Sequence, residues 1–269
     1  MEFYGLVGEK LTHSLSPQIH KGVFELLDID GAYKLFEIPK DKIDKLGESL
    51  KLLNIRGVNV TIPYKETVMN QLDYISPEAK KIGAVNTIYL KEGKLHGYNS
   101  DYYGFGMMLK NKGIVVKNKI VVVLGNGGAA KAINTYLLDE EVKTLYLVSR
   151  NKKSSNGIDN RIKLIDYEEL KSIKGDIIVN TTPVGMYPNM GISPVTSEII
   201  ANYNVLVDII YNPGMTEFLK IGRDLEKVVC GGLYMLVGQG IKSQEIWQGL
   251  DIDSEIVDKI YCDLEKNFK

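Results

Sequence analysis

Apolar residues along this chain follow two patterns that alternate from one end to the other. Short apolar runs are separated by longer segments in which apolar positions recur every third or fourth residue. Runs of the first kind predict buried β-strands, and segments of the second kind predict helices with one apolar face. Their regular alternation predicts an α/β fold.

The first part of the chain is predicted to form a mixed set of strands and helices. The expected strands are Tyr4–Val7, Tyr33–Ile38, Gly57–Ile62, Val85–Leu90 and Leu95–Tyr98, and the expected helices are Pro17–Leu27 and Lys40–Leu53. Ser16 followed by Pro17 is typical of a helix start, because serine caps a free N–H and proline has none to satisfy.

The second part has strands that are apolar throughout. They are expected at Ile120–Leu124, Thr144–Val148, Asp176–Asn180, Val205–Ile210 and Val228–Cys230. Runs without a polar face indicate a parallel sheet covered on both sides. Helices between most of these strands predict a doubly wound, Rossmann-like domain.

These patterns predict three parts of the chain. Residues 1–101 would form an α/β domain, residues 102–235 the Rossmann-like domain, and residues 236–269 closing helices that return to the first domain. A helix over Tyr102–Asn111 would lead into the second domain. The closing helices are expected at Leu233–Gly249 and Ser254–Asn267.

A glycine-rich run follows the first strand of the Rossmann-like domain and has the form G-x-G-x-x-A. Its residues are Gly125, Asn126, Gly127, Gly128, Ala129 and Ala130. Glycines let the backbone approach a pyrophosphate, and the following helix would point its free N–H groups at that ligand. We therefore expect a dinucleotide here; the alternative is a tight turn without a ligand.

The end of the next strand indicates which dinucleotide binds. An NAD site usually carries an acidic side chain here, which accepts from the ribose 2′-OH. This chain has Ser149, Arg150 and Asn151 instead. Arginine forms charge-assisted hydrogen bonds with a 2′-phosphate, so we expect NADP(H) rather than NAD(H). The alternative is that Arg150 belongs to a solvated basic loop.

Charge and composition exclude several classes of partner. The chain has 33 Lys and Arg against 34 Asp and Glu, for a net charge of −1, so we expect neither nucleic acid nor an anionic membrane surface as a partner. Three dispersed histidines make a catalytic metal unexpected. Neither a signal peptide nor a membrane-spanning segment is evident, and Cys230 and Cys262 lie in no redox or zinc motif, so we expect the cytoplasm.

Small polar residues cluster at four places in the first domain. They are Ser14–Pro17, Asn59–Lys65, Ala84–Thr87 and Asn99–Asp101. Taken singly, each has an ordinary explanation. Ser16 and Asp101 would serve as helix caps, Asn59 and Thr61 would face solvent, and Lys65 would be a surface lysine.

Taken together and in order, these segments resemble the shikimate dehydrogenase family. The resemblance continues in the Rossmann-like domain and beyond it, with Asp208–Pro213 and Gly232–Gly240, and so covers nearly the whole chain. It implies reduction of 3-dehydroshikimate to shikimate with NADPH, in the pathway to chorismate and the aromatic amino acids.

The resemblance also implies a role for individual residues. Lys65 and Asp101 would be the catalytic pair. Substrate would be held by these two residues and by Ser14, Ser16, Asn59, Thr61, Asn86, Tyr211 and Gln239. Ile209 and Gly232 would approach the nicotinamide, although an apolar strand residue and a turn glycine also have purely structural explanations. Asn151 stands where many family members have threonine, so its expected contact is the weakest.

The implied chemistry suits these residue types. Hydride delivery to a ketone builds negative charge on its oxygen, which a lysine stabilises and protonates. Two rival hypotheses stay open: a quinate/shikimate dehydrogenase, and a non-catalytic cofactor- or metabolite-sensing module that kept the fold. Either a monomer or a homodimer is compatible with the sequence.

Overall fold

The computed structural model describes residues 1–11, 14–150 and 159–268. The chain divides into two compact units. Unit 1 contains Met1–Gly104 and Val237–Asp263, and unit 2 contains Phe105–Leu236 and the residues from Leu264 onward. The divisions therefore fall inside three helices, α4 (Ser100–Asn111), α9 (Leu233–Gln248) and, near its end, α10 (Ser254–Glu265).

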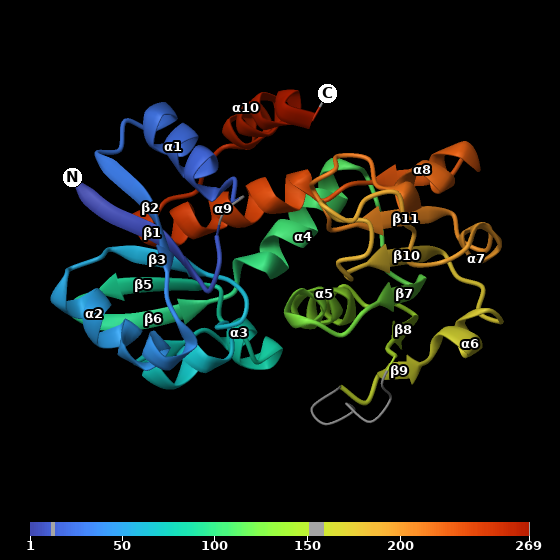
Figure 1. Ribbon diagram of the computed structural model, residues 1–269, viewed down its shortest axis with the longest axis horizontal. Helices are drawn as coiled ribbons and strands as arrows, with labels where there is room; N and C mark the ends of the chain where they lie inside the picture. The colour runs from blue at the N-terminus through green and yellow to red at the C-terminus, as the bar shows by residue number, and fades with distance from the viewer. Residues whose placement is uncertain (12–13, 151–158, 269) are drawn as a thin grey trace. The chain divides into compact units, whose positions relative to one another are not determined.

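Unit 1 is built on a mixed six-stranded sheet of order β2-β1-β3-β5-β6-β4 (Figure 1). β1, β2 and β3 are parallel, β5 runs antiparallel to β3 and β6, and β4 is parallel to β6. The strands are β1 (Glu2–Gly8), β2 (Gly31–Glu37), β3 (Gly57–Val60), β4 (Tyr74–Ile75), β5 (Thr87–Lys91) and β6 (Lys94–Tyr98). The other helices are α1 (Ser16–Leu26), α2 (Leu46–Leu52, after a 3-10 segment Lys40–Lys45), α3 (Pro77–Ile82) and α10 (Ser254–Glu265).

The central strand β3 is buried on both faces. Val58 and Val60 belong to an apolar cluster with residues of α2, such as Leu50. Gly57 and Asn59 point the other way, because side chains alternate along a strand. A Cβ on Gly57 would lie 2.3 Å from Nε1 of Trp247, so only glycine allows this part of α9 to pack so closely.

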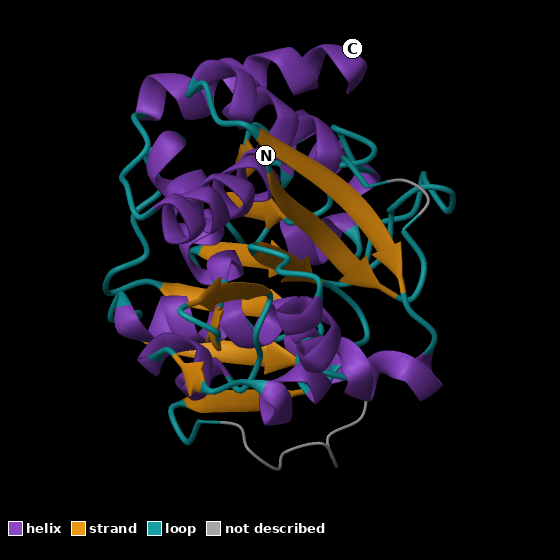
Figure 2. Ribbon diagram, turned by 90° about the vertical axis from the view of Figure 1, so that its left-hand side faces the viewer, coloured by secondary structure: helices purple, strands orange, loops and turns teal. Residues whose placement is uncertain are grey.

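Unit 2 contains a six-stranded sheet in which every pair is parallel. Its order, β12-β11-β10-β7-β8-β9, is that of the doubly wound dinucleotide-binding sheet, so the Rossmann-like prediction is confirmed. The strands are β7 (Ile120–Leu124), β8 (Thr144–Val148), β9 (Ile162–Ile165), β10 (Ile177–Asn180), β11 (Val205–Asp208) and β12 (Val228–Cys230). The helices include α5 (Gly128–Asp139), α6 (Tyr167–Leu170), α7 (Ser197–Ile200) and α8 (Glu217–Asp224) (Figure 1). Figure 2 shows the helices in purple and the strands in orange.

Several local predictions were wrong. The pattern missed β9, a short edge strand that carries a lysine, and it missed β4 and α3. It also extended the third strand to Ile62, although β3 ends at Val60. Edge and two-residue strands bury too little apolar surface to leave a clear pattern.

Both expected helix caps were also wrong. Leu15 is the N-cap residue of α1 and Ser16 is its first residue, with no side-chain cap bond. At α4, the side chain of Asn99 accepts from the N–H of Asp101 at 3.1 Å, so Asn99 takes the capping role. Ser16 and Asp101 are thereby left for other contacts.

In the part of the chain that the structure describes, no helix combines the length and apolar character needed to cross a membrane.

Candidate active site

Lys65 and Asp101 form a partly shielded ion pair in unit 1. Lys65 Nζ lies 2.6 Å from Asp101 Oδ2, and their side chains are 16% and 10% exposed. Asp101 lies in the first turn of α4, and Lys65 follows the turn after β3. Asn86 Nδ2 donates to the other carboxylate oxygen, Oδ1, at 2.9 Å. The sheet and α4 thus bring together three residues that are far apart in the sequence.

Asn86 is held in one orientation by its own neighbours. Its Oδ1 accepts from the backbone N–H of Ser100 at 2.7 Å, and from the hydroxyls of Ser100 and Thr87 at 3.1 Å each. With the oxygen occupied in this way, the amide nitrogen must face Asp101. Buried polar groups that are fully bonded are rigid, because any other orientation leaves a donor or acceptor unpaired.

Asn59 extends this buried network in a way that the sequence did not reveal, because its Nδ2 lies 3.2 Å from the hydroxyl of Thr87. Its Oδ1 accepts from Tyr33 Oη at 2.8 Å and pairs with His20 Nε2 at 3.1 Å, while its Nδ2 donates to Ser243 Oγ at 2.7 Å. Gln244 Nε2 lies 2.7 Å from His20 Nδ1. The imidazole therefore accepts at Nδ1 and donates from Nε2, and burial lowers the pKa of His20 to about 3.

The remaining expected substrate residues of unit 1 differ in how far they are exposed. Ser14 Oγ accepts from the N–H of Ser16 at 3.2 Å, and Ser16 itself is buried. Thr61 is half-buried directly after β3. Gln239 is half-buried on α9, where its backbone carbonyl oxygen accepts from Ser243 Oγ at 2.9 Å.

The glycine run of unit 2 begins with a tight turn and then opens to free space. Gly125 has φ of +97°, and a Cβ there would lie 2.9 Å from Cγ2 of Thr182. Apart from the adjoining residues and the backbone of the helix itself, no described atom lies within 4 Å of a Cβ built on Gly127 or Gly128, where the 12-residue helix α5 begins. Backbone N–H groups at the start of a helix, beside such open space, fit a dinucleotide pyrophosphate.

The turn also lies at the point where the strand order reverses, between β7 and β10, which is where doubly wound sheets bind ligands. Thr181 and Thr182, directly after β10, were missed by the sequence reasoning. Thr181 Oγ1 donates to the carbonyl oxygen of Leu124 at 2.7 Å. Their place after an apolar strand was the signal that would have identified them.

The expected phosphate-binding segment begins at the end of β8. Ser149 is half-buried, its N–H bonds the carbonyl of Ile165 at 3.0 Å, and Arg150 is exposed. Asn151 lies outside the described residues. Neither of these two residues is acidic. The lack of a carboxylate suits a 2′-phosphate better than a bare ribose 2′-hydroxyl.

Ile209 and Gly232 lie against each other in unit 2. A Cβ on Gly232 would lie 2.1 Å from the carbonyl oxygen of Ile209, so only glycine fits there. Tyr211 is half-buried and meets Phe268 edge-on, with ring centroids 6.4 Å apart. Burial raises the pKa of Tyr211 above its usual value.

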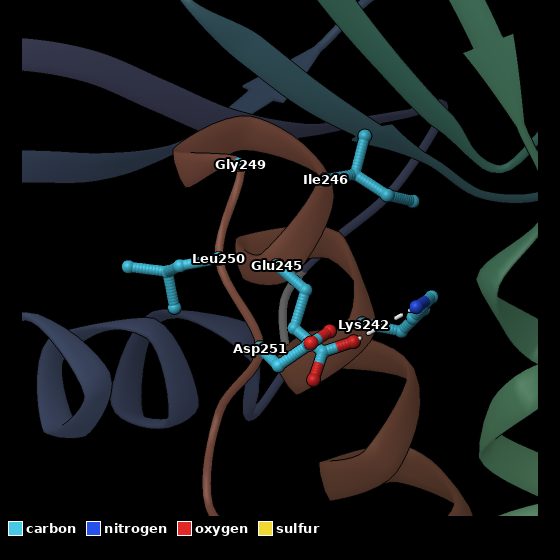
Figure 3. Close-up of a pocket in the computed structure, with 6 residues that line it drawn as sticks. All are labelled: Lys242, Glu245, Ile246, Gly249, Leu250 and Asp251. Carbon is cyan, nitrogen blue, oxygen red and sulfur yellow. Dashed lines mark hydrogen bonds and ion pairs between the residues drawn. The ribbon is translucent and has the colours of Figure 1, made fainter.

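A surface pocket at the end of α9 contains none of the expected residues (Figure 3). Two of its charged side chains are paired with each other: Lys242 Nζ lies 2.9 Å from Glu245 Oε2, and it also lies 4.8 Å from the ring centre of Tyr103. Glu245 also accepts from the N–H of Ile252 at 3.0 Å. These contacts explain the pocket as part of the helix end.

Comparison with known proteins identifies the family. Residues 6–88 match the model of the shikimate dehydrogenase substrate binding domain. Over the full length of both chains, the protein is 60% identical to a Clostridium beijerinckii protein named shikimate dehydrogenase (NADP(+)). The chain belongs to the shikimate dehydrogenase family. The resemblance inferred from the sequence is thereby confirmed.

Solved structures of this family agree with the fold. Shikimate dehydrogenase 1 from Peptoclostridium difficile has a TM-score of 0.94 and 60% identity, covering 100% of this chain and 99% of that one. A shikimate 5-dehydrogenase from Thermus thermophilus, solved in complex with NADP(H) and shikimate, has a TM-score of 0.88 and 31% identity, covering 97% and 98%.

The match to the family's substrate binding domain contains Lys65 and Asn86 but ends before Asp101. In the structure, unit 1 extends past that match to include Asp101 and the segment of α9 that carries Gln239 and Ser243. Gln239 and Ser243 are spaced four residues apart on one helix face, which was the sequence signal for Ser243. His20 had no such local signal, because its partners lie on β3 and α9.

Proposed function

We propose that this chain is a shikimate dehydrogenase, which catalyses the reversible reduction of 3-dehydroshikimate to shikimate with NADPH. The observation that carries the proposal is the shielded pair of Lys65 and Asp101, with Asn86 bonded to the same carboxylate. A family member that retains both partners in bonding geometry has the groups that proton transfer requires.

Lys65 acts on the substrate oxygen. During reduction the ketone oxygen gains negative charge, and the Lys65 ammonium stabilises that charge and donates the proton. In the reverse direction Lys65 accepts the proton of the hydroxyl. Asp101 holds the lysine in place, and the amide of Asn86 keeps the carboxylate from rotating away.

Neutral hydrogen-bonding groups hold the rest of the substrate. We assign this role to Ser14, Ser16, Asn59, Thr61, Asn86, Tyr211 and Gln239. A ring with several hydroxyls and one carboxylate needs many directional bonds, and hydroxyls and amides provide them with a smaller desolvation cost than charges would. A buried polar site also rejects analogues that lack a matching group.

NADP(H) would be held by unit 2. The pyrophosphate fits the glycine run Gly125–Ala130, and the 2′-phosphate fits Ser149, Arg150 and Asn151. Ile209 and Gly232 would border the nicotinamide. When bound, the cofactor supplies or takes up the hydride.

We also propose a cytoplasmic location and a monomer or homodimer. Both cysteines are free, Cys230 buried and Cys262 exposed, which suits a reducing compartment.

The deciding experiment is a steady-state assay of the purified protein with shikimate or quinate, each with NADP or NAD, following the absorbance of the reduced nicotinamide. The proposal expects the highest kcat/KM for shikimate with NADP. A higher kcat/KM for quinate would instead identify a quinate/shikimate dehydrogenase. Thermal stabilisation by NADP and shikimate without any turnover would identify a binding module.

A further inference from the structure

Asp208 is a fully buried carboxylate that no assigned role yet explains. It ends β11, and its side chain is closed off from solvent. Oδ2 accepts from Thr216 Oγ1 at 2.7 Å, and Oδ1 accepts from Asn180 Nδ2 and from the N–H of Ile210, each at 3.1 Å. Among the described residues no lysine or arginine is paired with it, and burial raises the pKa of Asp208 to about 6.

The three donors come from three different segments of unit 2. Asn180 ends β10, and its Oδ1 accepts from the N–H and hydroxyl of Thr182 at 3.0 and 2.7 Å. Ile210 lies in the loop after β11. Thr216 is the N-cap of α8, where its Oγ1 accepts from the N–H of Leu219 at 3.4 Å. The Asp208 carboxylate therefore links β10, the neighbour of β7 in the sheet, to both ends of the loop 209–215.

This loop carries two residues of the proposed site, Ile209 and Tyr211. Its beginning is tied to Asp208 through Ile210, and its end through Thr216. A further bond, from the N–H of Tyr187 to the carbonyl of Asn212 at 3.0 Å, fixes its middle. Burying a carboxylate without a cation is costly, so packing alone does not account for an acid at this position.

We propose that Asp208 is a positioning residue, which sets the conformation of loop 209–215 and thereby places Ile209 and Tyr211. The inference rests on the proposed function, since those two residues are assigned to cofactor and substrate. Asp208 touches neither ligand in this account. It acts by accepting hydrogen bonds from the two ends of the loop.

Thr216 allows a matched test. Thr216→Val is nearly isosteric but removes the hydroxyl, whereas Thr216→Ser keeps it. We expect Thr216→Val to raise KM for shikimate and lower kcat, with about a tenfold loss in kcat/KM, and Thr216→Ser to stay within about threefold of the wild type. Binding of adenosine 2′,5′-diphosphate, which needs Arg150 but not the loop, should be unchanged in both variants.

Two further measurements separate positioning from general destabilisation. Hydrogen exchange of peptides from 209–215 should be faster in Thr216→Val and in Asp208→Asn, but not in Thr216→Ser. Ile200→Val, which loses a buried methylene group from the apolar cluster that also contains Phe218 and Leu219 of α8, should lower stability without changing KM for shikimate.

The outcomes distinguish the two proposals. An active wild type whose Thr216→Val variant keeps its kcat/KM and its exchange rates would overturn the role of Asp208. A wild type that does not turn over shikimate would overturn the proposed function, while the exchange comparison would still test whether Asp208 orders the loop.

Discussion

Lys65 Nζ lies 2.6 Å from Asp101 Oδ2, and the opposite oxygen of the same carboxylate accepts from Asn86 at 2.9 Å. Both carboxylate oxygens of Asp101 are therefore hydrogen-bonded, and the carboxylate orients the ammonium group of Lys65. Ordinary surface ion pairs lack this second anchor and contribute little. The proposed function gives the lysine a chemical role, which a side-chain replacement tests directly.

Replacing Lys65 with methionine keeps the length of the side chain and removes the ammonium group. We expect kcat for shikimate oxidation to fall by about a hundredfold or more, because a positioned proton-transfer group contributes roughly 10²–10⁴-fold. KM for shikimate should change much less. Lys51→Met is the matched control, since Lys51 pairs with Asp73 at 2.9 Å on the surface. Near-normal turnover of Lys65→Met would exclude this residue from the chemistry.

Arg150 is expected to select the phosphorylated cofactor. Arg150→Ala should raise KM for NADP by about tenfold or more, because a hydrogen bond to a charged group is worth about 1.5–3 kcal/mol, and it should leave KM for NAD nearly unchanged. Arg161→Ala provides the control, since Arg161 lies close by in sequence and is already paired with Asp159 at 2.7 Å. An equal loss for both cofactors would show that Arg150 does not read the 2′-phosphate.

The two ends of the glycine run should respond differently to alanine. Gly125 has a positive φ and would place its Cβ against Thr182, so Gly125→Ala should lower the free energy of unfolding by roughly 1–3 kcal/mol. Gly127 has φ of −88° and open space at the Cβ position. Gly127→Ala should therefore cost at most about 1 kcal/mol but raise KM for NADP severalfold.

Thermal unfolding and steady-state kinetics on both glycine variants check these expectations. If Gly127→Ala bound NADP as the wild type does, the open space would not be where the pyrophosphate lies.

His20 should make stability depend on pH. Its folded-state pKa is about 3, below the usual 6.5, because it is buried. The unfolded chain therefore binds more protons between those values, and stability present above pH 6.5 is lost as the pH falls toward 3. Within that window the contribution of His20 to the free energy of unfolding falls by about 1.4 kcal/mol for each pH unit.

Urea unfolding of the wild type and of His20→Gln between about pH 7 and about pH 4.5 measures this slope. The variant should start lower at neutral pH, because it disturbs the bonds to Asn59 and Gln244, but should decline less steeply. His96→Gln is the control, since His96 is only partly buried and should change the slope much less. Parallel curves for wild type and His20→Gln would contradict the assignment.

Local sequence was sufficient for the order of the main elements and for the tight turn between β7 and α5. The runs Ile120–Leu124 and Thr144–Val148 form strands as predicted, because a continuous apolar run is stable only inside a covered sheet. The glycine run is equally local, since a positive φ and space for a ligand backbone depend on a few adjacent residues. Short edge elements such as β9 escaped prediction because they bury little surface.

Long-range packing decided the environment of the reactive groups. Nothing near Lys65 in the sequence shows that Asp101 will lie against it, or that Asn86 will donate a hydrogen bond to the same carboxylate. His20, Ser243 and the buried Asp208 acquire their partners only when distant strands and helices come together. A hydrogen bond depends on distance and direction within tenths of an ångström, and the fold sets these between residues that the sequence pattern treats as unrelated.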